Sequence, residues 1–77
     1  MEIKVWRLPV ASVERPHGLK YSFFYGRDGQ RLVGFDDERG KGDHRHILDR
    51  EEKYEFISID RLMADFFEAI EKIGGLK

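Results

Sequence analysis

The chain has no cysteine, only two prolines, no long hydrophobic run and almost no excess charge of either sign. Without cysteine, disulfides and thiolate metal sites are excluded, and this lack fits a reducing compartment. Without an apolar stretch of about 20 residues, no helix is expected to span a membrane. The charged N-terminus does not resemble a signal peptide. We therefore expect a cytoplasmic protein.

The formal net charge is −1, which gives no general attraction to nucleic acid or to an anionic membrane surface. Any anion must then be bound by a local arrangement of side chains. The chain has 77 residues, of which 40% are hydrophobic and 13% aromatic. This is enough for a hydrophobic core but for one domain only, so we expect residues 1–77 to form a single domain.

Alternating apolar residues predict a strand over residues 2–8 and two more on either side of Arg27–Asp28–Gly29, where glycine suits a positive φ angle. Another strand is predicted at residues 53–57. Ser58 is a good N-cap for a C-terminal helix with apolar residues at helical spacing. The predicted fold class is α+β, with a small antiparallel sheet of about four strands and one amphipathic helix packed on one face.

The hairpin at residues 19–36 is apolar on both faces, with Tyr21 and Phe23 on one face and Phe24 on the other. One helix covers one face only, so residues 9–18 or another chain must cover the second. A chain this short buries only about 60% of the surface that its unfolded form exposes. The need for further burial favours a second chain, and we expect a homodimer.

Residues 36–53 form a strongly polar segment. All of them except Gly40, Gly42, Ile47 and Leu48 are charged or histidine. A connection this long and charged is expected to be a functional loop. Closely spaced glycines let backbone N–H groups approach an anion, so Gly40 and Gly42 are candidate phosphate-binding residues.

His44 and His46 lie two residues apart, so in an extended segment both rings point to one side, with Asp43 and Arg45 on the other. Two imidazoles that titrate near neutrality can act as general base and general acid on an RNA phosphodiester. Asp43 is a candidate for orienting one imidazole. The cations that can stabilise the anionic transition state are Lys41 and Arg45, with Arg39 as a binding residue.

Two other interpretations of the same residues stay open. The histidine pair and a nearby aspartate could ligate a metal ion, but the neighbouring cations oppose this, so we assign no metal and no cofactor. Alternatively, the histidines could cap or bridge in a network of surface ion pairs, each of which contributes little. His17 lacks such neighbours in the sequence and is interpreted as structural or exposed.

Residues 40–46, GKGDHRH, and the following REEKYEFISIDRLMADFFEAI resemble the TumE family of small prokaryotic proteins. The matching positions are Gly34, Asp36, Gly40, Lys41, Gly42, Asp43, His44, Arg45, His46, Glu52, Tyr54, Phe56, Leu62, Asp65 and Phe66. Phe35 and Asp37 stand where the family pattern has tyrosine and asparagine, and Lys53 where it has proline. The resemblance covers about residues 19–70, and its specific part is the G-K-G-D-H-R-H core.

The resemblance implies the toxin of a toxin–antitoxin pair, with a helix-turn-helix antitoxin as its partner. Many small toxins of such pairs cleave RNA, which agrees with the acid–base interpretation of the histidines. We therefore predict a metal-independent ribonuclease with RNA as substrate. The alternative is a non-catalytic module that binds a phosphate, a nucleic acid or the antitoxin, and the acidic run at residues 36–38 favours it because it weakens attraction to RNA.

Overall fold

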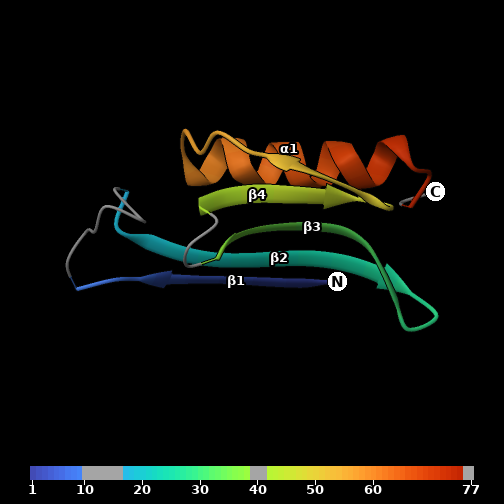
Figure 1. Ribbon diagram of the computed structural model, residues 1–77, viewed down its shortest axis with the longest axis horizontal. Coiled ribbons are helices and arrows are strands. Elements are labelled where there is room, and N and C mark those ends of the chain that lie inside the picture. Colours follow the sequence, from blue (N-terminus) through green and yellow to red (C-terminus); the bar gives the residue numbers. More distant parts are fainter. Residues whose placement is uncertain (10–16, 39–41, 76–77) are drawn as a thin grey trace.

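Five strands and one helix make up the computed structural model of the protein, which describes residues 1–9, 17–38 and 42–75 (Figure 1). The elements are β1 (Glu2–Arg7), β2 (Leu19–Arg27), β3 (Gln30–Glu38), β4 (Gly42–Ile47), β5 (Arg50–Lys53) and α1 (Ile59–Lys72). The strands form one sheet in the order β1-β2-β3-β4-β5, and all neighbours are antiparallel. The predicted α+β class is confirmed, with five strands rather than about four.

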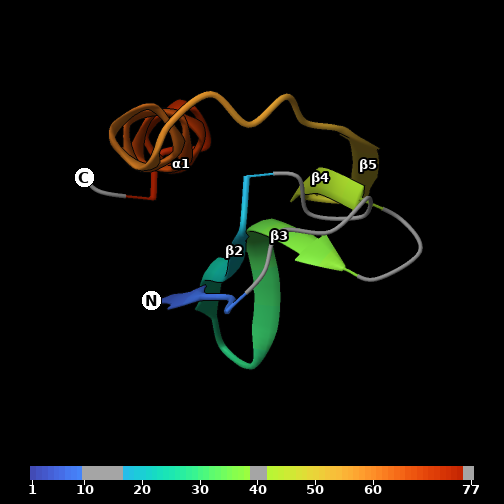
Figure 2. The same cartoon turned by 90° about the vertical axis from the view of Figure 1, so that its left-hand side faces the viewer.

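The expectation of a long loop over residues 36–53 is wrong. Strand β3 continues to Glu38, and β4 and β5 occupy most of the remainder. The strand expected at residues 53–57 is also misplaced, because β5 ends at Lys53 and residues 54–58 lead across to α1 (Figure 2). These strands lack the apolar alternation from which strands are recognised. Their charged side chains pair across the strands instead.

The β2–β3 hairpin turns at Asp28 and Gly29, whose φ angles are 55° and 77°. Two positive φ angles in a two-residue turn match the right-handed twist of the flanking strands. The predicted hairpin is therefore confirmed at its turn residues.

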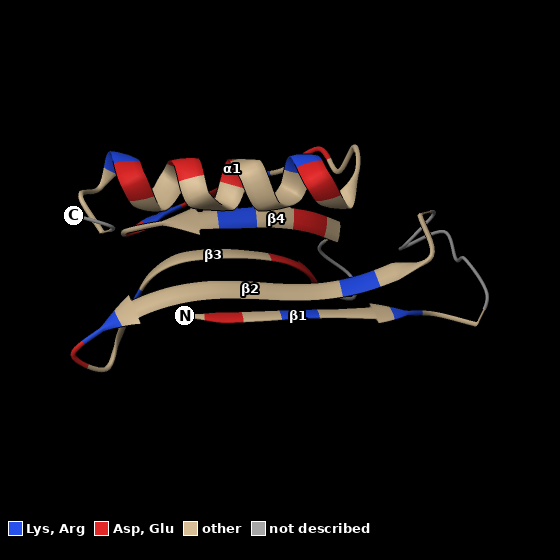
Figure 3. Cartoon of the chain, turned by 180° about the vertical axis from the view of Figure 1, so that it is seen from behind, with Lys and Arg blue, Asp and Glu red and all other residues tan. Residues whose placement is uncertain are grey.

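Helix α1 begins and ends as predicted. The Ser58 side chain accepts a hydrogen bond from the backbone N–H of Arg61, and Gly74 follows the last turn with a φ angle of 78°. Its charged side chains include two opposite-charge pairs one turn apart, Arg61–Asp65 and Glu68–Lys72, and charged bands alternate along the helix in Figure 3. Among the described residues, no helix is long and apolar enough to cross a membrane.

The core lies between α1 and one face of the sheet. Phe66 of α1 packs edge-to-face against Phe23 and Phe35, with ring centroids 5.4 and 6.0 Å apart. The buried hydrophobic residues are Tyr21, Phe23, Val33, Phe35, Leu62, Phe66, Ala69 and Ile70. Because side chains alternate along a strand, the residues between them point away from α1. We call these two sides of the sheet the helix-covered face and the outer face.

Candidate functional site

The polar side chains of strand β4 alternate between the two faces of the sheet. Arg45 lies opposite the core residue Phe35 in the strand register, so Asp43 and Arg45 belong to the helix-covered face. His44 and His46 alternate with them and belong to the outer face. Their rings lie side by side, with centroids 5.6 Å apart. The structure therefore brings the two predicted histidines together on one side of the sheet.

His44 is held at both ring nitrogens. Its Nδ1 lies 3.1 Å from the backbone carbonyl oxygen of Gly42, and its Nε2 lies 2.6 Å from Oδ1 of Asp36, the residue opposite it on β3. A carbonyl oxygen can only accept, so Nδ1 carries a proton and donates it. The Nε2–Oδ1 contact is close but not aligned as a hydrogen bond, and Asp36 Oδ1 is buried without a hydrogen-bond donor.

His46 is also paired with a carboxylate, at 2.8 Å between its Nε2 and Oε2 of Glu51 on β5. His46 is half-exposed, whereas only 5% of His44 is exposed. Access to His44 is through a hollow of about 320 Å³ that His44, Glu51, Glu52 and Lys53 line. The site is thus two adjacent histidine–carboxylate pairs across three neighbouring strands.

Asp43 does not face either of these imidazoles. On the helix-covered face, its Oδ2 accepts hydrogen bonds from the Tyr21 hydroxyl at 2.8 Å and from His17 Nε2 at 3.1 Å. The backbone N–H of Leu19 donates to His17 Nδ1 at 3.1 Å, which leaves the proton of the neutral ring on Nε2. The expected partnership of Asp43 with His44 or His46 is therefore corrected. Asp36 and Glu51 contact those rings instead.

The Asp43 cluster is closed in on the helix-covered face. The His17 ring packs against Phe56 with 4.3 Å between centroids, and Tyr21 stacks on the same ring at 5.7 Å. Burial raises the pKa of the Tyr21 hydroxyl well above its usual value, and the hydrogen bond to Asp43 raises it further. Tyr21 therefore stays a neutral donor, which indicates a structural role for this cluster. The expectation that His17 is structural or exposed fits its contacts here.

A half-buried hydroxyl on this face, that of Tyr54, behaves in the same way. Tyr54 donates to Oδ2 of Asp65 at 2.6 Å, and burial followed by this hydrogen bond raises the pKa of Tyr54. Asp65 also accepts from Arg61 at 3.0 Å, and this bond raises the pKa of the Arg61 guanidinium. The hydrogen bond from Tyr54 to Asp65 therefore attaches the segment that follows β5 to helix α1.

Arg45 points away from the histidines as well. Its Nε donates to Oε1 of Glu52 at 2.6 Å on the neighbouring strand. Arg45 is therefore not a cation that crowds His44 and His46, although the sequence suggested so. Gly42 is placed with a φ angle of 72°, and its carbonyl holds His44. The remaining predicted site residues, Arg39, Gly40 and Lys41, lie outside the described residues.

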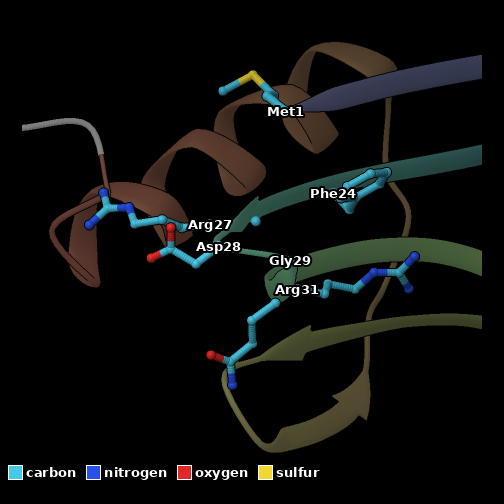
Figure 4. A pocket seen from close by; sticks show the side chains of 8 residues that line it. Met1, Phe24, Arg27, Asp28, Gly29 and Arg31 are labelled. Carbon is cyan, nitrogen blue, oxygen red and sulfur yellow. The ribbon is translucent and has the colours of Figure 1, made fainter.

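The outer face also carries two aromatic rings, each beside a cation. The Lys20 ammonium lies 5.5 Å from the Trp6 ring, which is 44% exposed, and the Arg31 guanidinium lies 5.0 Å from the Phe24 ring. Phe24 and Arg31 also line a hollow of about 380 Å³ beside the hairpin turn (Figure 4). This hollow does not include the histidines.

One row of the sheet connects this hollow to the histidines. Gly34 lies directly between Phe24 on β2 and His46 on β4 in the strand register. Glycine has no side chain, and the Arg31 side chain lies over this position, with its Cδ 3.4 Å from where a Cβ of residue 34 would be. Phe24 is not among the site residues predicted from the sequence. Its position on the same face as His46 follows only from the strand register, in which both residues pair with Gly34.

A comparison with family models gives one match, to the family described as toxin TumE, over residues 1–73. No curated protein and no solved structure shows significant similarity to the chain. The match covers nearly the whole chain and includes both histidine clusters.

Proposed function

The chain belongs to the TumE toxin family, and from this premise we propose that it acts as a metal-independent ribonuclease whose reacting groups lie on the outer face. Membership makes it the toxin component of a toxin–antitoxin system, with an antitoxin as partner. The observation that carries the proposal is the pair of adjacent histidines, His44 and His46, each in contact with its own carboxylate. Paired imidazoles with carboxylate partners are suited to proton transfer in both directions.

In this reaction one imidazole takes the proton of a ribose 2′-OH. The 2′ oxygen then attacks the adjacent phosphorus, and the bond from phosphorus to the 5′ oxygen breaks. The other imidazole gives its proton to the leaving 5′ oxygen, so the products are a 2′,3′-cyclic phosphate and a free 5′-OH. Asp36 and Glu51 lie against the Nε2 atoms of His44 and His46 and stabilise the imidazolium form of each ring. On His46, Nδ1 is then the nitrogen that exchanges the proton, whereas on His44 it is Nε2, because the Nδ1–H is donated to Gly42. Lys41 and Arg39 are proposed to stabilise the anionic transition state, as the sequence suggests.

Binding of RNA is supported by the aromatic rings and cations of the same face. Bases of a single strand stack on accessible aromatic side chains, and this face presents the exposed Trp6 ring and the half-buried Phe24 ring. Lys20 and Arg31 supply local positive charge, which the net charge of −1 does not. The placement of Arg45 and Asp43 on the other face gives them a supporting role in holding β4, not contact with substrate.

The proposal is tested by incubating the purified protein with cellular RNA and with a defined oligonucleotide in the presence of EDTA. Wild type should produce 2′,3′-cyclic phosphate ends, and a 2′-O-methyl oligonucleotide should resist cleavage. Removing a general acid or base typically costs about 10²–10⁴-fold in rate, which is the loss expected for His44→Gln and for His46→Gln. The matched control is His17→Gln, a histidine of the other cluster, which should retain the rate.

Circular dichroism must show that each variant is folded at the assay temperature. Absence of cleavage by wild type would reject the ribonuclease proposal. Equal rates for wild type and His44→Gln would reject the assignment of the site. RNA binding without cleavage would instead support the non-catalytic alternative.

A further inference from the structure

The outer-face cluster has a second chemical capacity. One ring nitrogen of His44, one of His46 and one carboxylate oxygen of Glu51 lie within 4.8 Å of one another. We propose that these three side chains bind a divalent transition-metal ion, with Zn²⁺ as the best fit, and that Asp36 can complete the coordination. This goes beyond the proposed ribonuclease activity and does not depend on it.

The hydrogen bond of His44 prepares its ring for a metal. Its Nδ1–H is donated to the Gly42 carbonyl at 3.1 Å, which leaves the lone pair of a neutral ring on Nε2. Histidines that bind metal almost always donate their other N–H to a carbonyl or carboxylate in this way. The His44 ring is also almost fully buried, so its orientation is fixed by its surroundings.

The contact between His44 Nε2 and Asp36 Oδ1 also points to a cation. The two atoms are 2.6 Å apart, yet no hydrogen bond is aligned between them, and the buried oxygen has no donor. A buried carboxylate oxygen that accepts no hydrogen bond is costly. A metal ion bound beside the ring nitrogen would satisfy both atoms, which is why Asp36 is the proposed fourth ligand.

The other histidine cluster brings together similar atoms, but its histidine does not have a ring nitrogen with a free lone pair directed at the carboxylates. His17, Asp37 and Asp43 also place one potential ligand atom each within 4.8 Å of the others. There, however, His17 Nδ1 already accepts the N–H of Leu19, so the neutral ring carries its proton on Nε2 and donates it to Asp43. A metal ion would have to displace the proton from Nε2, because the lone pair of Nδ1 already accepts a hydrogen bond. The outer-face cluster is therefore the better metal site.

The donor set selects the kind of metal. Two imidazoles with carboxylates suit Zn²⁺ and similar transition metals, whereas Mg²⁺ and Ca²⁺ prefer oxygen ligands alone. Lys53 lies opposite His44 on β5 and opposes a cation, but Asp36 and Glu51 supply two negative charges against its one. Two Zn²⁺ ligands at about 2.1 Å can be at most about 4.2 Å apart. The exposed Glu51 side chain can move to bring its carboxylate into this range.

On His44, metal binding and proton transfer use the same ring nitrogen, Nε2, because the Nδ1–H is donated to the Gly42 carbonyl. A nitrogen that coordinates Zn²⁺ cannot take a proton from RNA, so saturating Zn²⁺ is expected to suppress cleavage. This consequence rests on the proposed ribonuclease function, whereas metal binding itself does not.

The test is isothermal titration calorimetry of ZnCl₂ into tag-free, full-length protein that has been treated with EDTA and dialysed. A polyhistidine tag must be absent because it binds Zn²⁺ itself. Wild type should bind one Zn²⁺ per chain, and His44→Ala and Glu51→Gln should each lower the affinity at least about tenfold. His17→Ala, which removes the only imidazole of the other described cluster, should leave stoichiometry and affinity unchanged.

Glu51→Gln keeps the experiment decisive if His44→Ala does not fold, because the Glu51 side chain is 44% exposed. The proposal is overturned if wild type binds no Zn²⁺, if Glu51→Gln binds as tightly as wild type, or if only His17→Ala loses binding. Since no RNA is present, failure of metal binding leaves the ribonuclease proposal standing, and failure of RNA cleavage leaves metal binding standing.

Discussion

The two faces of the sheet use the same residue types for different purposes. On the helix-covered face, His17 and Tyr21 both donate hydrogen bonds to Asp43 and both pack against Phe56, and burial keeps the tyrosine hydroxyl neutral. On the outer face, His44 and His46 contact Asp36 and Glu51 beside a hollow, on the same side of the sheet as the Trp6 and Phe24 rings. A histidine next to an aspartate is therefore not informative by itself. The two faces differ in whether the histidine nitrogens are bonded inside the protein or are directed toward an accessible surface.

The alternation of one short strand creates this difference. Within the sequence DHRH, residues 43–46, the first and third side chains fasten β4 to its neighbours under the helix, and the second and fourth present imidazoles on the other side. One specific family motif thus combines a structural half and a proposed chemical half. The comparison can be tested by changing one face at a time.

The largest expected effect is on stability and belongs to the helix-covered face. Phe35 is fully buried against Phe66 and Tyr54, so Phe35→Ala should lower the free energy of unfolding by about 3–5 kcal/mol. That is a large part of the stability expected of a small domain. Phe24→Ala on the outer face should cost only about 1 kcal/mol, since that ring is only half-buried. Urea unfolding followed by circular dichroism measures both losses, and equal losses would contradict the assignment of one buried face.

A smaller effect is expected at alkaline pH, and it also belongs to the helix-covered face. The pKa of Tyr21 is higher in the folded protein than the value of about 10 in the unfolded chain. The stabilisation from the neutral hydroxyl is therefore complete below about pH 10, and it is lost as pH rises above that value because the unfolded chain deprotonates first. The slope from one such group is at most about 1.4 kcal/mol per pH unit.

Tyr21→Phe should make this alkaline loss of stability shallower, and should cost about 1 kcal/mol at neutral pH through the lost hydrogen bond to Asp43. Tyr54→Phe provides a second test, because burial and Asp65 raise that pKa too. Chemical unfolding measured at intervals between about pH 8 and pH 11 gives the slopes. Identical slopes for wild type and both variants would show that these hydroxyls are not buried as described.

Sequence reasoning succeeded where apolar side chains alternate or recur with helical spacing. It predicted the hairpin at Asp28–Gly29, the N-cap at Ser58 and the common side of His44 and His46. It missed β4 and β5 as strands, because charged cross-strand pairs such as Arg45–Glu52 leave no hydrophobic pattern.

The partners of the histidines were harder to predict than the histidines themselves. Glu51 reaches His46, and Asp36 reaches His44, only because of the strand register, which a single sequence does not specify. For the same reason, Asp43 was paired with its sequence neighbours, whereas the fold brings His17 to it over a separation of 26 residues. The expected homodimer stays a prediction.

The central claim is that the outer face, and not the helix-covered face, meets the substrate. The chain has three histidines, two on the outer face and one in the other cluster, so their ring signals report on both faces. We would titrate a 2′-O-methyl RNA oligonucleotide, which cannot be cleaved by the proposed route, and follow the ring resonances by NMR in EDTA. The account predicts that the signals of His44 and His46 shift while that of His17 stays in place. A shift of His17 alone, or of none of the three at saturating RNA, would contradict it.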